Sequence, residues 1–379
     1  MDSIKKLYDI TAFGDLWTQP GMLLMLLIGI FLLFLGIRKK YEPLLLVPIG
    51  FGVILANLPG AGMGIVAEEM VRFEDGRYMT LIEIAGEYGI MNYLYYMLIK
   101  TGFLPPIIFL GVGALTDFGP MLRNLRLSLF GAAAQLGIFT VFFAAIAVGF
   151  TPQEAGSLGI IGGGDGPTAI YISIILAPHM LGPIAIAAYS YMALVPVIIP
   201  PIARMLCTKN ELSINMKKMD KLYPPKTTIK NITAVKIAFP IVLGILVAFF
   251  VPTAVPLIGM LMFGNLIKEI GVATGRLSEA ASGPIMNTAT IFLGLAVGAT
   301  MTATTFLDIR TLGIIFGGLV AFAISVAGGI VAVKVYNLFA GKKINPLIGA
   351  TGLSAVPMAS RVANEIAVKH DPGNHILQY

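Results

Sequence analysis

One acidic residue in an apolar, glycine-rich stretch is the strongest chemical signal in the sequence. Asp165 lies in the segment 162–168, GGGDGPT, and no other Asp, Glu, Lys or Arg occurs in 155–203. A carboxylate at membrane depth persists mainly where it pairs, titrates or binds a cation. The glycines and Pro167 disfavour regular helix, so bare carbonyls would surround the acid and form a hard oxygen site for Na⁺ or H⁺. The alternative is a solvated Asp165 that only caps the helix beginning near Pro167.

A second interrupted segment, 345–361 (NPLIGATGLSAVPMASR), offers uncharged oxygen ligands. Asn345, Thr351 and Ser354 carry side-chain oxygens, and Gly349 exposes the backbone. Neutral ligands opposite one carboxylate suit a monovalent cation, whereas calcium sites generally gather several acids. Ordinary packing of membrane helices, in which small residues are common, explains the same segment equally well.

Two further side chains are candidates for chemistry. Arg361 ends the second segment, where it could bind an anion or extend its long side chain to the membrane interface. Tyr191 lies in AAYSYMALVP together with Tyr189 and Ser190. Its hydroxyl could bind a cation or relay a proton, although most tyrosines in spans satisfy a neighbour or mark the interface.

Several other chemistries are excluded. Gly164, Gly166 and Ala169 formally fit a dinucleotide fingerprint, but no strand precedes them and no acid follows about 20 residues on. The single Cys207 excludes a disulfide framework and a cysteine metal cluster. The histidines show no zinc-ligand spacing.

The composition indicates where these residues lie. Of 379 residues, 57% are hydrophobic and only 12% are charged, with a mean hydropathy of +0.86. Soluble domains carry about 25% charged residues, so a soluble enzyme of two or three domains is not expected. The high apolar content rules out a disordered chain. The net charge of +6 lies largely in short loops beside apolar segments, which argues against nucleic acid as a partner. We therefore expect an all-α polytopic membrane protein.

Nine apolar runs are long enough to cross a bilayer, which takes roughly 20 residues. We expect spanning helices at 21–37, 44–58, 103–119, 127–150, 181–206, 232–251, 253–271, 284–303 and 311–335. Two more apolar segments, 155–178 and 345–368, contain Gly, Pro and polar residues and are expected to be broken or re-entrant. The stretch 88–99 is amphipathic and suits the membrane interface.

Lysine and arginine in short loops predict the orientation. Basic residues at 38–40, 123–126, 207–231 and 342–343 indicate the cytoplasmic side, and the acid-rich segment 59–87 falls outside. These assignments agree only if 155–178 enters and leaves by the same face.

An internal repeat divides the chain. IFLG occurs at 108–111 and again at 291–294, and each unit ends in one of the interrupted motifs. The charge rule sends 103–119 inward and 284–303 outward, as in transporters whose inverted repeats place two broken elements at the binding site. We expect N-terminal spans with an external and interfacial segment at 1–100, a first inverted repeat at 101–206, a cytoplasmic lysine-rich loop at 207–231 and a second inverted repeat at 232–379.

The motifs GGGDGPTAI at 162–170 and NPLIGATGLSAVPMASRVAN at 345–364 closely resemble those of the β subunits of sodium-pumping, biotin-dependent decarboxylases. That family serves oxaloacetate, glutaconyl-CoA and methylmalonyl-CoA decarboxylases. The resemblance implies a carboxybiotin decarboxylase, a lyase-type translocase that consumes a proton and exports Na⁺. It also implies the bacterial cytoplasmic (inner) membrane and a multi-subunit complex. The expected partners are a carboxyltransferase (α) subunit, a biotin carrier protein, a small γ/δ-type membrane subunit and further copies of the β subunit.

The resemblance also assigns roles to residues. Asp165 matches the essential membrane carboxylate, proposed to bind Na⁺ and exchange protons, and Tyr191 matches a tyrosine implicated in sodium binding or proton delivery. The functional positions of the second motif are matched by Asn345, Gly349, Ser354 and Arg361. Arg361 is the expected contact for carboxybiotin. The other class of function that fits the same residues is a stand-alone Na⁺-coupled transporter or Na⁺/H⁺ exchanger; a membrane scaffold without transport leaves Asp165 unexplained.

Overall fold

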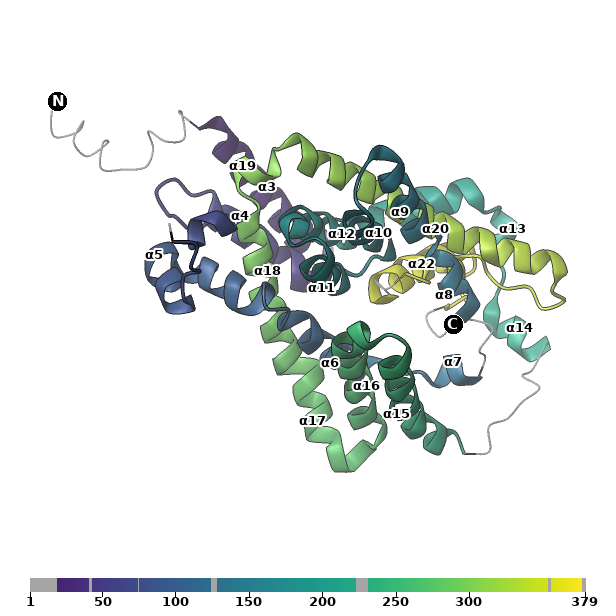
Figure 1. Cartoon of the computed structure of the whole chain (residues 1–379). Helices are drawn as coiled ribbons and strands as arrows, with labels where there is room; N and C mark the ends of the chain where they lie inside the picture. Colours follow the sequence, from purple (N-terminus) through teal and green to yellow (C-terminus); the bar gives the residue numbers. More distant parts are fainter. Residues whose placement is uncertain are drawn as a thin grey trace.

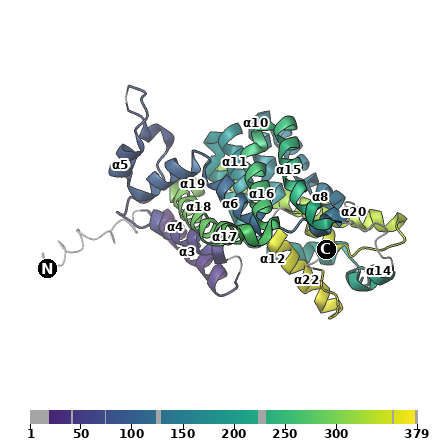
Figure 2. The same ribbon diagram turned by 90° about the horizontal axis from the view of Figure 1, so that it is seen from below.

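The computed structural model describes residues 19–40, 43–73, 75–123, 128–222, 231–353 and 356–376. Throughout these ranges the regular structure is helical, apart from one isolated antiparallel bridge between Arg72 and Tyr78. Figure 1 shows the long helices packed side by side, with α12 (Leu181–Leu206) near the centre. Figure 2 shows α5 (Leu81–Leu94) toward one side of the molecule, and α14 (Met216–Leu222) and α22 (Val356–His370) toward the opposite side. The expected all-α membrane fold is confirmed.

Five helices are long and apolar enough to cross a membrane, and two bent helix pairs raise the number to at most seven in the described part of the chain. The five are α3 (Pro20–Ile37), Leu129–Val148 within α8 (Ser128–Ala134) and α9 (Leu136–Val148), α15 (Ile232–Phe250), Gly271–Thr300 ending in α18 (Met286–Thr300), and Thr311–Phe339 within α20 (Ile309–Phe339).

The expected count of nine spanning helices is therefore not confirmed. The segments expected at 44–58 and 253–271 form α4 (Pro43–Ala56) and α16 (Val255–Glu269), with 14 and 15 residues. At about 1.5 Å per residue, each is shorter than a hydrocarbon core of about 30 Å. Turns follow α4, and α16 is continued only by the short 3₁₀ helices η6 (Pro252–Ala254) and η7 (Gly271–Thr274), so the length of an apolar run overestimates the length of its α-helix.

The two bent pairs have local causes. The first pair joins α5 and the π-helix η2 (Tyr95–Ile99) to α6 (Leu104–Leu115) at 66°, and Gly102 between them has a φ of +72°. The second bend, of 61°, separates Pro178–Tyr191 from Leu194–Leu206. Pro196 lies one turn beyond that bend and lacks the amide hydrogen that a regular helix would use there.

Two helix pairs approach each other closely through glycine. A Cβ built on Gly113 of α6 would lie 2.0 Å from the carbonyl oxygen of Leu261, and one on Gly264 of α16 would lie 2.0 Å from that of Leu110. The pair of α4 and α18 repeats this arrangement through Gly52 and Gly298. Membrane helices have little hydrophobic drive to associate, so close backbone packing of this kind stabilises their contacts. Both helices that carry IFLG, α6 and α18, are thus held by a glycine crossing; the division of the chain into repeats stays a prediction.

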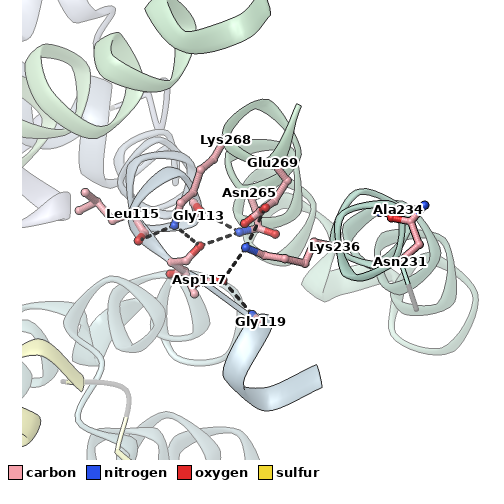
Figure 3. Close-up of polar contacts among 11 residues, drawn as sticks. Gly113, Leu115, Asp117, Gly119, Asn231, Ala234, Lys236, Asn265, Lys268 and Glu269 are labelled. Atoms are coloured by element: carbon pink, nitrogen blue, oxygen red, sulfur yellow. Dashed lines mark hydrogen bonds and ion pairs between the residues drawn. The ribbon is translucent and has the colours of Figure 1, made fainter. Parts of the chain in front are cut away.

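A charged cluster ties α15 to the ends of α6 and α16 (Figure 3). The Lys236 ammonium lies 2.8 Å from Asp117 Oδ1 and 3.0 Å from Glu269 Oε2. Lys268 donates hydrogen bonds to the carbonyl oxygens of Leu115 and Thr116, at 3.1 and 2.9 Å. The hydrogen bond and charge of Lys236 hold the pKa of Asp117 below its ordinary value. Three helix ends therefore share one charge network.

The first prediction tests the glycine crossing. We expect Gly264→Ala to lower the free energy of unfolding by about 1–3 kcal/mol, because the added methyl group forces α16 away from α6. Gly259→Ala on the same helix is the matched control, since its Cβ meets only Val255 at an ordinary 3.7 Å. Thermal unfolding of the purified protein in lipid nanodiscs measures both. Equal melting temperatures for the two variants would contradict the close contact.

The second prediction concerns Lys236→Met. This change leaves the carboxylate of Glu269, whose side chain is 9% exposed, without its counter-charge. We expect a loss of about 1–3 kcal/mol at neutral pH. Because the pKa of Asp117 is lowered in the folded protein, the stability from its pairing is complete above its ordinary pKa of about 4 and is lost as the pH falls through the lowered value. The melting-temperature difference from the unchanged protein should therefore shrink below about pH 4, and Asp117→Asn should weaken the same acid dependence. A difference that does not change with pH would contradict the role of Asp117.

Candidate functional site

The first interrupted element carries Asp165 at its turning point. Helix α10 (Pro152–Gly159) continues as the 3₁₀ turn η4 (Ile160–Gly163), and Gly164 then adopts a left-handed conformation with a φ of +68°. The chain restarts as α11 (Gly166–Leu176), with Asp165 in extended conformation as its N-cap. The interruption expected from the glycines and Pro167 is therefore present.

The carboxylate of Asp165 is partly buried and makes local hydrogen bonds. Oδ1 accepts from the Thr168 amide at 3.2 Å, and Oδ2 accepts from the Thr168 hydroxyl at 2.7 Å. In the described part of the chain, no cation side chain pairs with it. Asp165 therefore does cap α11, as the helix-capping interpretation expected. Capping leaves lone pairs free on both oxygens, because an ionised carboxylate accepts about four hydrogen bonds.

The tip of the first element packs against the second. A Cβ built on Gly164 would lie 2.9 Å from the Phe322 ring of α20 and 3.7 Å from Leu353 Cβ. The second element begins with Asn345, forms the short helix α21 (Leu347–Ala350) and resumes as α22. The two motifs, distant in sequence, therefore meet beside Asp165.

Asn345 and Gly349 have structural contacts that their sequence pattern did not reveal. Asn345 is fully buried, and its amide nitrogen donates to the carbonyl oxygens of Leu212 and Ile214, at 2.9 and 3.1 Å. Gly349 crosses Gly329 of α20 so closely that a Cβ on either would lie 2.0 Å from the other's carbonyl oxygen. Both residues anchor the second element, and their role as Na⁺ ligands stays a prediction.

The remaining two predicted residues are Ser354 and Arg361. Ser354 is outside the described residues. Arg361 is exposed on α22, and no described acidic residue forms an ion pair with it. The described part of the chain therefore does not cover the Arg361 side chain.

The two tyrosines of α12 face different surroundings. The Tyr191 ring packs on Gly318 of α20, and its hydroxyl is buried without a hydrogen-bond partner in the described structure. The Tyr189 ring instead covers Gly166, where a Cβ would lie 2.6 Å from the ring carbon that bears the hydroxyl. The Tyr189 hydroxyl is also buried and unpartnered. Of the two, Tyr189 is the one that contacts the residue next to Asp165.

Sequence reasoning did not single out Tyr189 or Gln135. Gln135 lies at the junction of α8 and α9, and its side-chain nitrogen donates to the carbonyl oxygens of Gly131 at 3.3 Å and Gly352 at 3.5 Å. It thus links a spanning helix to the second element. An amide side chain within the apolar run 127–150 was the signal that could have identified it.

Comparison with known proteins finds relatives over nearly the whole length of the chain. The family model of the Na⁺-transporting oxaloacetate decarboxylase β subunit matches residues 21–379. The chain is 48% identical to the methylmalonyl-CoA decarboxylase β subunit of Propionigenium modestum, with 100% of this chain and 94% of the relative covered. It is 45% identical to the corresponding Veillonella parvula subunit, with coverages of 98% and 90%. It is 44% identical to the probable oxaloacetate decarboxylase β chain of Vibrio cholerae, with coverages of 98% and 93%.

A shared fold alone would not require a match over nearly the whole chain, nor sequence identities as high as those of these relatives. The apolar helices show a multi-pass membrane protein, and the matched family transports sodium. The chain therefore belongs to the family of β subunits of Na⁺-transporting decarboxylases.

Proposed function

We propose that this subunit decarboxylates carboxybiotin at the membrane and uses the reaction to export Na⁺, with Asp165 as the residue common to both processes. The observation that carries the proposal is one carboxylate, without a cationic partner among the described residues, at the meeting point of two interrupted elements. An acid in such surroundings persists mainly where it titrates or binds a cation.

The reaction needs a proton. Cleavage of the bond between the ureido nitrogen and the carboxyl carbon of carboxybiotin releases CO₂, and the nitrogen left behind takes up H⁺. Asp165 can supply or pass on that proton, because Na⁺ beside the carboxylate favours its ionised form and Na⁺ release favours its protonated form. Binding of Na⁺ and of H⁺ at one group are therefore coupled reciprocally, which links ion movement to the reaction.

The remaining predicted residues divide into two roles. We infer that Arg361 binds the carboxylate of carboxybiotin, supported by its exposed position and the strength of charge-assisted hydrogen bonds. When the second element moves, the cation site would be completed by Tyr191, Asn345, Gly349 and Ser354. The buried Tyr191 hydroxyl without a hydrogen-bond partner supports such a role, because a buried hydroxyl normally has one.

This proposal includes partners and a location. Carboxybiotin is delivered on a separate biotin carrier protein that a carboxyltransferase subunit has loaded, and a small γ/δ-type membrane subunit and further β subunits complete the complex in the bacterial inner membrane. The names of the relatives, which are subunits of decarboxylases, support a multi-subunit assembly. They favour the pump over a stand-alone sodium carrier.

The third prediction tests Asp165. The complex is reconstituted in liposomes with carboxyltransferase and biotin carrier, and ²²Na⁺ uptake and CO₂ release are measured together. Asp165→Asn should abolish both activities, because the amide cannot ionise, while it keeps the size of the side chain and its capacity to cap α11. Asp75→Asn, in an exposed loop, is the matched control and should retain both. Near-normal sodium transport by Asp165→Asn would overturn the assignment. Loss of transport with full sodium-stimulated CO₂ release would overturn the coupling.

A further inference from the structure

A cavity of about 270 Å³ is lined by residues that precede α5, at 65–69, and by Tyr95, Tyr96 and Lys100, which follow it. Its lining includes Glu68, Glu69, His179, Ile186, Thr300 and Thr305, and we call it the acidic vestibule. The segment 59–87, which supplies both glutamates, is the acid-rich part of the chain that the charge rule places outside. The charge rule therefore predicts that the vestibule opens on the external face.

The charges of the vestibule leave one carboxylate in excess. Among the residues that line it, Glu68 is neutralised by Lys100, whose ammonium lies 2.5 Å from Glu68 Oε2, and Arg72, 3.4 Å from Glu68 Oε1, lies outside the lining. Glu69 is exposed and has no ion pair among the described residues. His179 Nε2 lies 2.9 Å from Glu154 Oε1. A hollow surface with an excess negative charge raises the local concentration of cations.

A second, smaller cavity of about 10 Å³ shares Ile186 with the vestibule. The surface that faces it is apolar, so it is a dry part of the barrier between the vestibule and the interior. Ile186 lines both cavities, and Tyr189 and Ser190 line the smaller one. Ile186 is 1% exposed, so its side chain fills the space between them.

The row formed by the vestibule, Ile186 and the smaller cavity ends at Tyr189, next to the Asp165 segment. Ile186 and Tyr189 lie three residues apart on α12 and share one face of that helix. The Tyr189 ring covers Gly166, the residue after Asp165. Tyr189 as a whole is 2% exposed, and its hydroxyl has no hydrogen-bond partner in the described structure. A buried hydroxyl without a hydrogen-bond partner is an available oxygen ligand or donor.

We propose that the acidic vestibule is the external mouth of a Na⁺ path to Asp165, with Ile186 as its apolar gate and the Tyr189 hydroxyl as the last polar contact before the carboxylate. The inference rests on the proposed role of Asp165 and adds the route by which the ion leaves. Glu69 holds the cation near the mouth. A small displacement of Ile186 joins the two cavities, and the Tyr189 oxygen replaces part of the hydration shell of the ion.

The fourth prediction tests the gate by thiol labelling of the reconstituted complex. Cys207 is first replaced by Ser, and Ile186→Cys is then exposed from outside to a cationic methanethiosulfonate reagent and to its anionic counterpart. The cationic reagent should react faster, Na⁺ should slow its reaction, and labelling should stop ²²Na⁺ transport. Ala187→Cys, which is fully buried in the other hydrophobic cluster of α12, is the matched control and should not react. No reaction at position 186, or equal rates with both reagents, would overturn the path.

Two variants separate this inference from the role of Asp165. Glu69→Gln should reduce the ratio of cationic to anionic labelling rates about fourfold. One negative charge about 10 Å from the thiol in water speeds the cationic reagent and slows the anionic one, and its removal loses both effects. In Asp165→Asn, position 186 should still react but Na⁺ should no longer slow the reaction. Labelling that is insensitive to Na⁺ in the chain with Asp165 intact would refute the path while leaving the role of Asp165 standing.

The fifth prediction concerns Tyr189→Phe, which keeps the ring on Gly166 and removes only the hydroxyl. We expect the Na⁺ concentration for half-maximal CO₂ release to rise about fivefold, the effect of one lost hydrogen bond or ligand contact. Tyr171→Phe is the matched control, because its hydroxyl donates to the Thr253 carbonyl oxygen at 3.2 Å and lines neither cavity. An unchanged sodium dependence in Tyr189→Phe would exclude the hydroxyl from the path.

Discussion

The structure depends on one constraint, namely the cost of interrupting a helix inside the membrane. Non-helical backbone at that depth is tolerated only where protein covers it, because its amide and carbonyl groups find no water there. The break at Gly164 and Asp165 meets this condition, since it is covered by Phe322 of α20, by Tyr189 of α12 and by Leu353 of the second element. The helices around the site thus serve mainly to bury two short irregular segments.

Close helix contacts make that cover possible. Glycine crossings join α6 to α16, α4 to α18, and α20 to α21, each with backbone so near that no Cβ fits. Packing of this kind tolerates sliding poorly, because each crossing interlocks two backbones. The charge network of Lys236, Asp117 and Glu269 adds a polar connection at the helix ends. Because α21 belongs to the second interrupted element, that element is expected to move together with α20, relative to the pairs α6–α16 and α4–α18.

Helix α12 connects the frame to the site. Two hydrophobic clusters meet along it, with Tyr191 in one and Tyr189 in the other. The bend of 61° beyond Tyr191 falls one turn before Pro196. Because successive tyrosines on this helix face opposite clusters, a rotation or straightening of α12 would change both environments of the site at once.

The sequence by itself determined the membrane class, the two interruptions and the isolation of Asp165, because these follow from local composition and from the absence of helix-forming residues. Only the three-dimensional structure decided that α4 and α16 are shorter than the apolar runs that contain them, that Asn345 anchors a loop, and that Tyr189, not Tyr191, contacts the residue after Asp165. Sequence spacing places Tyr189 and Tyr191 on different faces of one helix. Which face meets Asp165 depends on how α12 packs between two clusters that are built from distant segments, and no local pattern contains that information.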